Sequence, residues 1–158
     1  KDGRLWAQFF EDYDVTTNRN SWAAMNTVRY LCEEQDSLDP DWQQDARVLI
    51  TFVNKNFTSI WSGVLVCGEQ DVDTKPWGGA VSTYGAGLAM YARATGSDEF
   101  KGLAWQAMNY ALYSIDFDGC PSEAVWKGKR RGGWQEDAHT DKLHNFVDAM
   151  TAFPEWAK

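Results

Sequence analysis

Three carboxylates, an amide and a tryptophan stand close together in the segment 62–79, and these residue types suit carbohydrate chemistry. The five side chains are those of Glu69, Gln70, Asp71, Asp73 and Trp77. Hydrolysis of a glycosidic bond needs two carboxyl groups beside that bond, one protonated and one ionised. An aromatic ring offers the C–H face of a sugar an apolar platform. A solvated acidic loop that only joins two pairs of helices is the alternative interpretation of the same residues.

Within this segment, Glu69 is the candidate general acid. The negative charges of Asp71 and Asp73, together with the apolar run that precedes them, are expected to raise the pKa of Glu69. Asp73, or Asp137 from a second long loop, is the candidate base. Gln70 and Asp71 are candidate contacts to the sugar.

The second long loop, between residues 116 and 140, carries aromatic and basic side chains. Its candidate substrate contacts are two tryptophans, an arginine and a histidine: Trp126, Trp134, Arg130 and His139. The indole rings are candidate sugar platforms, although a tryptophan that pins a loop to the core is the more common case. The arginine and the histidine could instead neutralise and deprotonate an acidic sugar, which is the chemistry of polysaccharide lyases and sugar epimerases.

The elements that must position these loops are helices, because apolar residues outside the loops recur three and four positions apart. In the first helix, the residues that recur at helical spacing are Trp22, Met25, Val28, Leu31 and Cys32. The expected N-caps of the first four helices are Ser21, Asp39, Ser82 and either Ser97 or Asp98. Between the second and third helices, Val64–Cys67 has the residue types of a short buried strand.

The order of these elements predicts an all-α domain made of repeated antiparallel helical hairpins. Its expected parts are an entry segment (1–20), a first hairpin (21–57), a long loop (58–80), a second hairpin (81–115), another long loop (116–140) and a fifth helix (141–153). The hairpins match in residue type, which indicates an internal repeat of about 60 residues. Because the helices of a hairpin are antiparallel, both long loops should leave from the same end of the domain. Long loops inside a compact domain are usually functional.

The fifth helix has no hairpin partner in this sequence. Its apolar stripe is Leu143, Phe146, Val147 and Met150. We therefore expect the stripe to be exposed, and exposed apolar patches promote association. The expected partner is a second copy of the chain or a missing second piece of the same protein. The chain also lacks an initiator methionine, so we expect a processed product, and an extracellular or periplasmic location is slightly favoured.

The second hairpin has a recognisable pattern. Tyr91 stands near the end of its first helix, a Thr-Gly-Ser-Asp-Glu-Phe turn runs from Thr95 to Phe100, and aromatic-rich long loops flank the pair. In these respects the chain resembles the six-hairpin glycosidases. That resemblance implies part of an (α/α)6 toroid, an architecture shared with related polysaccharide lyases and sugar epimerases. It also implies that a sugar is held at the loop end by aromatic platforms and loop carboxylates.

Composition disfavours several other classes of protein. The net charge of −8 argues against a nucleic-acid partner, and no apolar run is long enough to span a membrane. No Cys or His pair has the spacing of a zinc site. We interpret His139, Asp141 and His144 as capping and packing residues, so we expect no metal and no cofactor.

These patterns together predict a glycoside hydrolase that acts on a carbohydrate substrate through loop carboxylates and tryptophan platforms. A polysaccharide lyase or sugar epimerase is the alternative within the same class of substrate. A helical-repeat module that binds a glycan or a protein without turnover is the alternative from another class.

Overall fold

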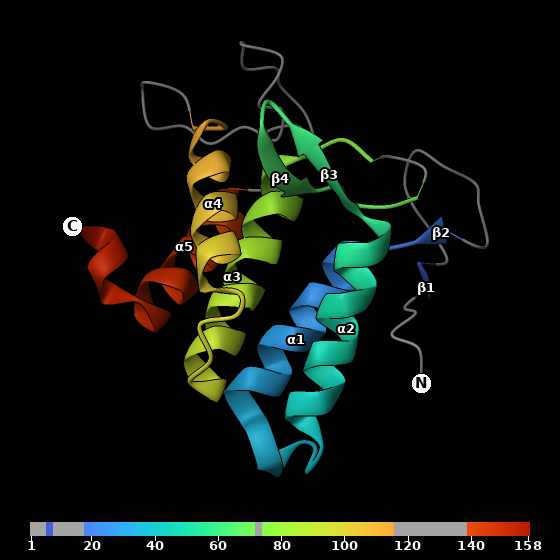
Figure 1. Ribbon diagram of the computed structural model, residues 1–158, viewed down its shortest axis with the longest axis vertical. Helices are drawn as coiled ribbons and strands as arrows, with labels where there is room; N and C mark the ends of the chain where they lie inside the picture. The colour runs from blue at the N-terminus through green and yellow to red at the C-terminus, as the bar shows by residue number, and fades with distance from the viewer. Residues whose placement is uncertain (1–5, 8–17, 72–73, 116–138) are drawn as a thin grey trace.

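The computed structural model describes residues 6–7, 18–71, 74–115 and 139–158, and most of this part of the chain is helical (Figure 1). The elements in chain order are β1 (Trp6–Ala7), β2 (Asn18–Arg19), α1 (Ser21–Glu34), η1 (Gln35–Ser37), α2 (Trp42–Asn56), β3 (Thr58–Trp61), β4 (Val64–Cys67), α3 (Gly78–Thr95), α4 (Lys101–Leu112), α5 (His139–Ala152) and η4 (Pro154–Ala157). The expectation of a mainly helical fold is confirmed. None of the helices in the described ranges is both long and apolar enough to cross a lipid bilayer.

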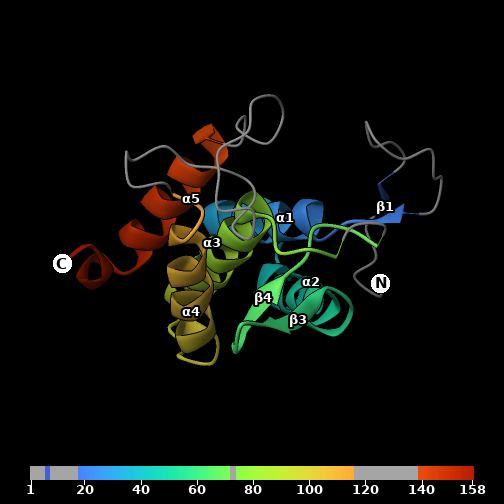
Figure 2. The ribbon, with the colours of Figure 1, turned by 90° about the horizontal axis from the view of Figure 1, so that it is seen from above.

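Helix α3 lies at the centre of the molecule, against α1, α4 and α5 (Figure 2). Its glycines let the neighbouring helices come close. A Cβ atom added at Gly85 would lie 2.7 Å from Sδ of Met108 on α4, and one added at Gly87 would lie 2.6 Å from Cε of Met25 on α1. Glycine weakens a helix, but here it allows α3 to be buried on several sides at once.

The helices begin at other residues than the expected N-caps. Asn20, not Ser21, caps α1, because its Oδ1 accepts a hydrogen bond from the backbone N–H of Ala23 (2.7 Å). Helix α2 begins at Trp42, after a turn in which Oδ1 of Asp39 accepts from the backbone N–H of Asp41 (2.9 Å). Local sequence therefore predicted the helix ends to within a few residues, while the capping partners depend on how the chain enters each helix.

In the second helix pair, α3 and α4, the observed helix starts lie further from the expected N-caps. Helix α3 begins at Gly78, so Ser82 lies inside the helix and is fully buried, and it is not a cap. Helix α4 begins at Lys101, and Oγ of Ser97 accepts from the backbone N–H of Glu99 (3.2 Å) in the turn that precedes it. The turn starts at Gly96, whose positive φ of 68° ends α3 in the manner common for glycine.

Part of the first long loop is a β-hairpin. Strands β3 and β4 pair antiparallel, and the turn between them places Ser62 and Gly63 at positive φ (51° and 81°), which suits a tight hairpin turn. Val66 and Cys67 are fully buried, so the expected strand at Val64–Cys67 is confirmed. Its partner β3 was expected to be irregular, because cross-strand pairing leaves little trace in a half-exposed four-residue segment.

Helix α5 buries two polar side chains together with small apolar ones. Leu143 and Val147 are 62 % and 60 % exposed, which confirms the expected exposed stripe, whereas Phe146 packs in part against the core. Lys142 and Asn145 on the other face are almost completely buried. The segment that follows α5 returns to α4.

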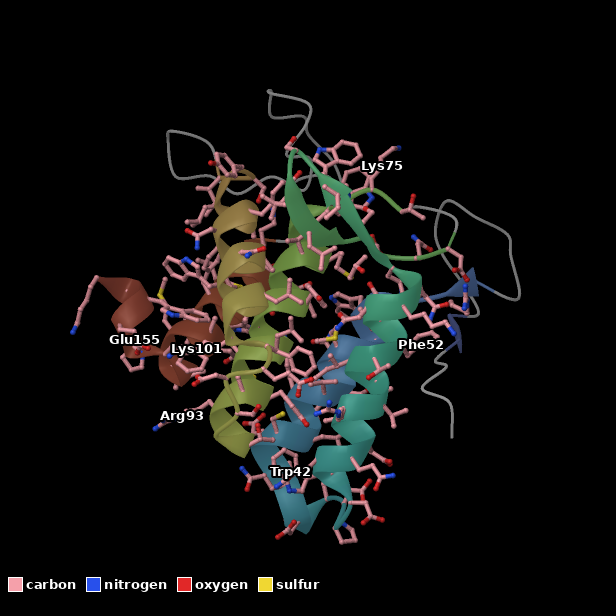
Figure 3. The ribbon with its side chains drawn as sticks, in the orientation of Figure 1. Trp42, Phe52, Lys75, Arg93, Lys101 and Glu155 are labelled. Atoms are coloured by element: carbon pink, nitrogen blue, oxygen red, sulfur yellow. The ribbon has the colours of Figure 1, made fainter. Side chains whose placement is uncertain are left out.

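Two side-chain contacts hold that returning segment in place. Nζ of Lys101 on α4 donates to Oε1 of Glu155 on η4 (3.1 Å), and Figure 3 shows the two side chains beside each other. Trp156 of η4 also packs against Trp105 of α4, with 5.2 Å between the ring centroids. The C-terminal end of the described chain is therefore anchored to α4, while the apolar face of α5 stays open.

Candidate functional site

The acidic segment at the loop end is pinned to the N-terminus of α1. The backbone N–H and the Oγ of Ser21 both donate to the carbonyl oxygen of Glu69 (2.8 and 2.9 Å). One residue along, Asn20 and Gln70 form an antiparallel bridge, and the backbone N–H of Asp71 donates to the carbonyl oxygen of Arg19 (3.1 Å). The segment 69–71 therefore runs beside residues 19–21 as a short, ordered ledge.

Asp71 is held by Arg19. The guanidinium donates from Nε to Oδ2 (2.8 Å) and from Nη2 to Oδ1 (2.9 Å), and the backbone N–H of Arg19 donates to Oδ2 (3.0 Å). Partial burial works to raise the pKa of Asp71, but the hydrogen bonds and the charge of Arg19 outweigh it and hold this pKa below its usual value. Asp71 is thus an ionised partner of Arg19 at neutral pH, and its side chain has a structural role.

The other predicted residues of the first loop have different surroundings. Glu69 is half-buried, and Gln70 is buried. Trp77 precedes α3 and is only 5 % exposed, so it offers little ring surface to a sugar. The structure brings Glu69, Gln70 and Asp71 together at the start of α1, and it places Trp77 at the start of α3.

The remaining predicted site residues lie outside the described part of the chain. These are Asp73, Trp126, Arg130, Trp134 and Asp137. His139 is the first residue of α5 and not a residue before that helix, although only its backbone is described.

A groove with a volume of about 600 Å³ runs between α1 and α5, with Met90 of α3 contributing to its floor. We call it the α1–α5 groove. Its charged and aromatic lining residues are Trp22, Arg29, Tyr30, Glu33, Asp141, His144 and Asp148. With Asn26, which also lines the groove, Trp22, Arg29 and Glu33 follow one another at steps of three and four, as do the residues from α5, so each helix presents one continuous face.

A polar network forms one wall of this groove and reaches into the core. Arg29 of α1 donates from Nη1 to Oδ1 of Asn145 on α5 (2.7 Å), and its Nη2 forms an ion pair with Asp148. Nδ2 of Asn145 donates in turn to Oγ of Ser82 (2.9 Å) and Oγ1 of Thr83 (3.0 Å) on α3. Three helices are therefore joined through one buried amide, and α5 is held at a defined distance from α1.

The lining residues of the groove expose two aromatic rings. Trp22 is 42 % exposed and Tyr30 is 63 % exposed. They stand eight residues apart on α1, so their positions along the helix axis differ by about 12 Å. The helical spacing of Trp22 with Met25 and Val28 is confirmed by α1, but the Trp22 ring lies at the groove edge while Ala24, Met25 and Val28 face the core.

A sequence signal for the groove was available. Trp22, Asn26, Arg29 and Glu33 recur at helical spacing, as do Asp141, His144 and Asp148. Asp141 and His144 stand three positions apart, share one face of α5 and line the same groove. What the sequence did not reveal is that these two faces, more than a hundred residues apart, lie opposite each other.

A second, more open groove of about 440 Å³ lies on the outer face of α2. Its cationic lining residues are Arg19, Arg47 and Lys55. Both arginines already bind carboxylates, because Arg47 donates to the two oxygens of Glu99 (2.7 and 2.9 Å) and Arg19 binds Asp71. Their hydrogen-bonding capacity is largely used within the protein, so this groove is the weaker candidate for a ligand.

Comparisons with known proteins do not assign a family. No protein family matches the sequence, and no curated protein and no solved structure is detectably similar to it. Among the residues that the structure describes, no three His, Cys, Asp or Glu side chains come together as they would around a metal ion. The candidate site therefore consists of the α1–α5 groove and the ledge at its Trp22 end.

Proposed function

We propose that the protein is carbohydrate-active, and that it binds a glycan along the α1–α5 groove and hydrolyses it with carboxylates at the loop end. One juxtaposition supports this proposal. Trp22, an exposed ring at one end of the groove, follows directly on Ser21, which holds the backbone of Glu69 through two hydrogen bonds. A ring platform and a carboxylate-bearing segment therefore meet at the same end of the molecule.

The groove has the residue types that sugars require. A pyranose packs an apolar C–H face on an aromatic ring and bonds its hydroxyl groups to charged and polar side chains. Trp22 and Tyr30 supply the rings, and Glu33, Asp141 and His144 supply polar groups along the groove. The separation of the rings along α1 suits a chain of sugars better than a single ring.

Within this proposal, Glu69 is the general acid and Asp73 or Asp137 is the second carboxylate. Asp71 does not compete for the role of acid, because its contact with Arg19 keeps it ionised. Catalysis by a positioned general acid contributes about 10²–10⁴-fold to the rate. Retention or inversion would follow from the distance between Glu69 and its partner.

For the architecture, we propose that the helix pairs α1–α2 and α3–α4 are repeated hairpins of an (α/α)6 toroid, of which α5 begins a further hairpin. The connections between the helices of each pair lie at the same end of the molecule, opposite the β3–β4 hairpin (Figure 1). Helix α3, buried on several sides, would belong to the inner ring of helices.

The test combines turnover and binding. Glu69→Gln keeps the size of the side chain but removes its transferable proton, so release of reducing sugar from soluble oligosaccharides should fall about 10²–10⁴-fold, with glycan binding retained. Trp22→Ala and Tyr30→Ala should weaken binding. Matched controls are Glu34→Gln, an exposed carboxylate outside the groove, and Tyr113→Ala, a ring that is 76 % exposed on another surface.

The results of these measurements distinguish a glycoside hydrolase from a binding module without turnover. Binding that depends on Trp22, together with turnover that is absent or indifferent to Glu69→Gln, would identify a non-catalytic glycan-binding module. Binding that is insensitive to Trp22→Ala and Tyr30→Ala would overturn the proposed role of the groove.

A further inference from the structure

We propose that the α1–α5 groove selects sugars that carry a positively charged amine, such as oligomers of glucosamine, over neutral and acidic sugars. The inference rests on the proposed function, since it names the class of sugar that the groove would bind. It is carried by the charges of the groove, the pairing of those charges and the nature of the exposed rings.

The lining of the groove is negatively charged. Among the lining residues that the structure describes, the three carboxylates Glu33, Asp141 and Asp148 outnumber the one arginine, Arg29. Arg29 is moreover occupied by Asp148 and Asn145 and has limited capacity for a uronate. Among the described lining residues, a sugar carboxylate would therefore meet groups of its own charge and no unoccupied guanidinium.

Two of the carboxylates have no partner of opposite charge within the described residues. Glu33 and Asp141 form no ion pair there, and both side chains belong to exposed residues. They lie on opposite walls of the groove, one on α1 and one on α5. A ligand with amines spaced along its length could pair with both, whereas a neutral glycan would only offer them hydroxyl groups.

The exposed rings favour the same ligand. The faces of Trp and Tyr attract ammonium groups by about 0.5–1 kcal/mol at exposed sites. Trp22 and Tyr30 stand on the same helix as Glu33 and on the face that lines the groove. An amino sugar would therefore gain from ring stacking, cation–π attraction and ion pairing in one groove.

The groove on α2 shows the reverse arrangement and serves as an internal comparison. Its charged lining residues are Arg19, Arg47 and Lys55, without a carboxylate among the residues that line it in the described structure. Arg19 and Arg47 are bound by Asp71 and Glu99, and Lys55 forms no ion pair among the described residues, so an acidic glycan on this face would contact mainly Lys55. The two surfaces therefore make opposite predictions about ligand charge.

The experiment measures binding of four tetramers by calorimetry: glucosamine, N-acetylglucosamine, glucose and galacturonate. The glucosamine tetramer should bind most tightly, and its affinity should fall at high salt, which screens exposed charges. Glu33→Gln and Asp141→Asn should each weaken that binding by about 2- to 5-fold, the range of an exposed ion pair. Each substitution should weaken binding of the glucose tetramer less than binding of the glucosamine tetramer, because the amide that replaces the carboxylate still bonds hydroxyl groups.

Controls come from the same helix and the same groove. Glu34→Gln removes the carboxylate next to Glu33 but outside the groove, and it should leave every affinity unchanged. Trp22→Ala should weaken binding of the amine-bearing tetramer and of the neutral tetramers by similar factors. Thermal melting of each variant checks that the fold is retained.

Three results would overturn the inference. If the glucose tetramer binds as tightly as the glucosamine tetramer and Trp22→Ala weakens both, selection for amines is wrong while the proposed glycan-binding groove stands. If the galacturonate tetramer binds most tightly, the charge argument is wrong. If no tetramer binds, the proposed function fails together with the inference.

Discussion

Helices α3 and α5 pack against each other, yet the larger side chains that they bury differ in kind. In α3, 14 of the 18 residues are buried, and most of these are small or apolar. In α5, the buried side chains include Lys142 and Asn145, while Leu143 and Val147 are exposed. Gly78 at the start of α3 even leaves room for the Lys142 side chain, because a Cβ atom there would lie 2.6 Å from its Nζ.

The difference shows that two forces orient these helices. An apolar helix such as α3 is buried because burial of apolar surface is favourable, at about 25 cal/mol per Å². The orientation of α5 depends on its polar partners. Asn145 forms hydrogen bonds with the side chains of Arg29, Ser82 and Thr83. Buried polar groups that lose such partners destabilise the fold strongly. A few exposed apolar side chains cost less than several unpaired buried donors.

The sharpest test of this comparison sets two residues of α5 against each other. Asn145→Ala should lower the free energy of unfolding by about 2–4 kcal/mol, because it removes the partner of three polar side chains. Val147→Ala, two positions along and 60 % exposed, should change it by less than about 0.5 kcal/mol. Urea denaturation measures both. A larger loss for Val147→Ala would show that apolar contacts orient α5 after all.

The second test concerns the close packing of α3. Gly85→Val should destabilise the fold by about 1–3 kcal/mol through overpacking, because the first added carbon lies 2.7 Å from Sδ of Met108 and 3.2 Å from Cβ of Ala107. Gly102→Ala on α4 is the matched control, since nothing lies within 4 Å of the added carbon. It should stabilise the protein by about 0.5–1 kcal/mol, as expected for alanine in a helix. Equal effects at the two sites would contradict the proposed packing limit.

The partly exposed ion pair of Arg19 and Asp71 can be compared with the buried contacts of Asn145. Asp71→Asn should cost roughly 0.5–1 kcal/mol at about pH 7, because the Arg19–Asp71 pair is partly solvated and screened. The folded pKa of Asp71 lies below its unfolded value, so the stabilisation is present above the unfolded pKa. It is lost as the pH falls through the folded pKa. Denaturation of the two proteins at about pH 7 and about pH 3 should therefore show a difference that shrinks in acid. A pH-independent difference would rule out the charge as its cause.

The smallest expected effect on stability belongs to the exposed face of α5, where we expect the change to appear in association instead. If a second copy covers Leu143, Val147 and Met150, light scattering should detect concentration-dependent association. Val147→Lys should weaken that association by placing a charge in the apolar patch, with little change in unfolding. Lys101→Ala, which removes a contact on another surface, should leave it unchanged. A wild-type chain that stays monomeric at high concentration would leave this face without a role in self-association.

Much of the fold follows from local sequence. The apolar spacing along α1, α2 and α4 predicted these helices because each has one stripe that must leave water, and the exposed stripe of α5 was predicted because the sequence offers it no partner. The N-caps were not predicted correctly, since the donor that a side chain meets depends on the path of the preceding residues. Ser21, for example, binds the carbonyl oxygens of Gly68 and Glu69, which are distant in sequence.

The sequence by itself determined the helical class, the acidic character of the chain and the presence of carboxylates beside aromatic residues in the loop that holds Glu69. Only the tertiary structure decided that Asp71 is bound by Arg19, that Trp77 is buried, and that Trp22 and Tyr30 face Asp141 across a groove. The physical reason is the sequence distance over which the deciding contacts act. Helix formation depends on neighbours three or four residues away, whereas a groove between α1 and α5 depends on how α3 and the Arg29–Asn145 network hold those two helices apart.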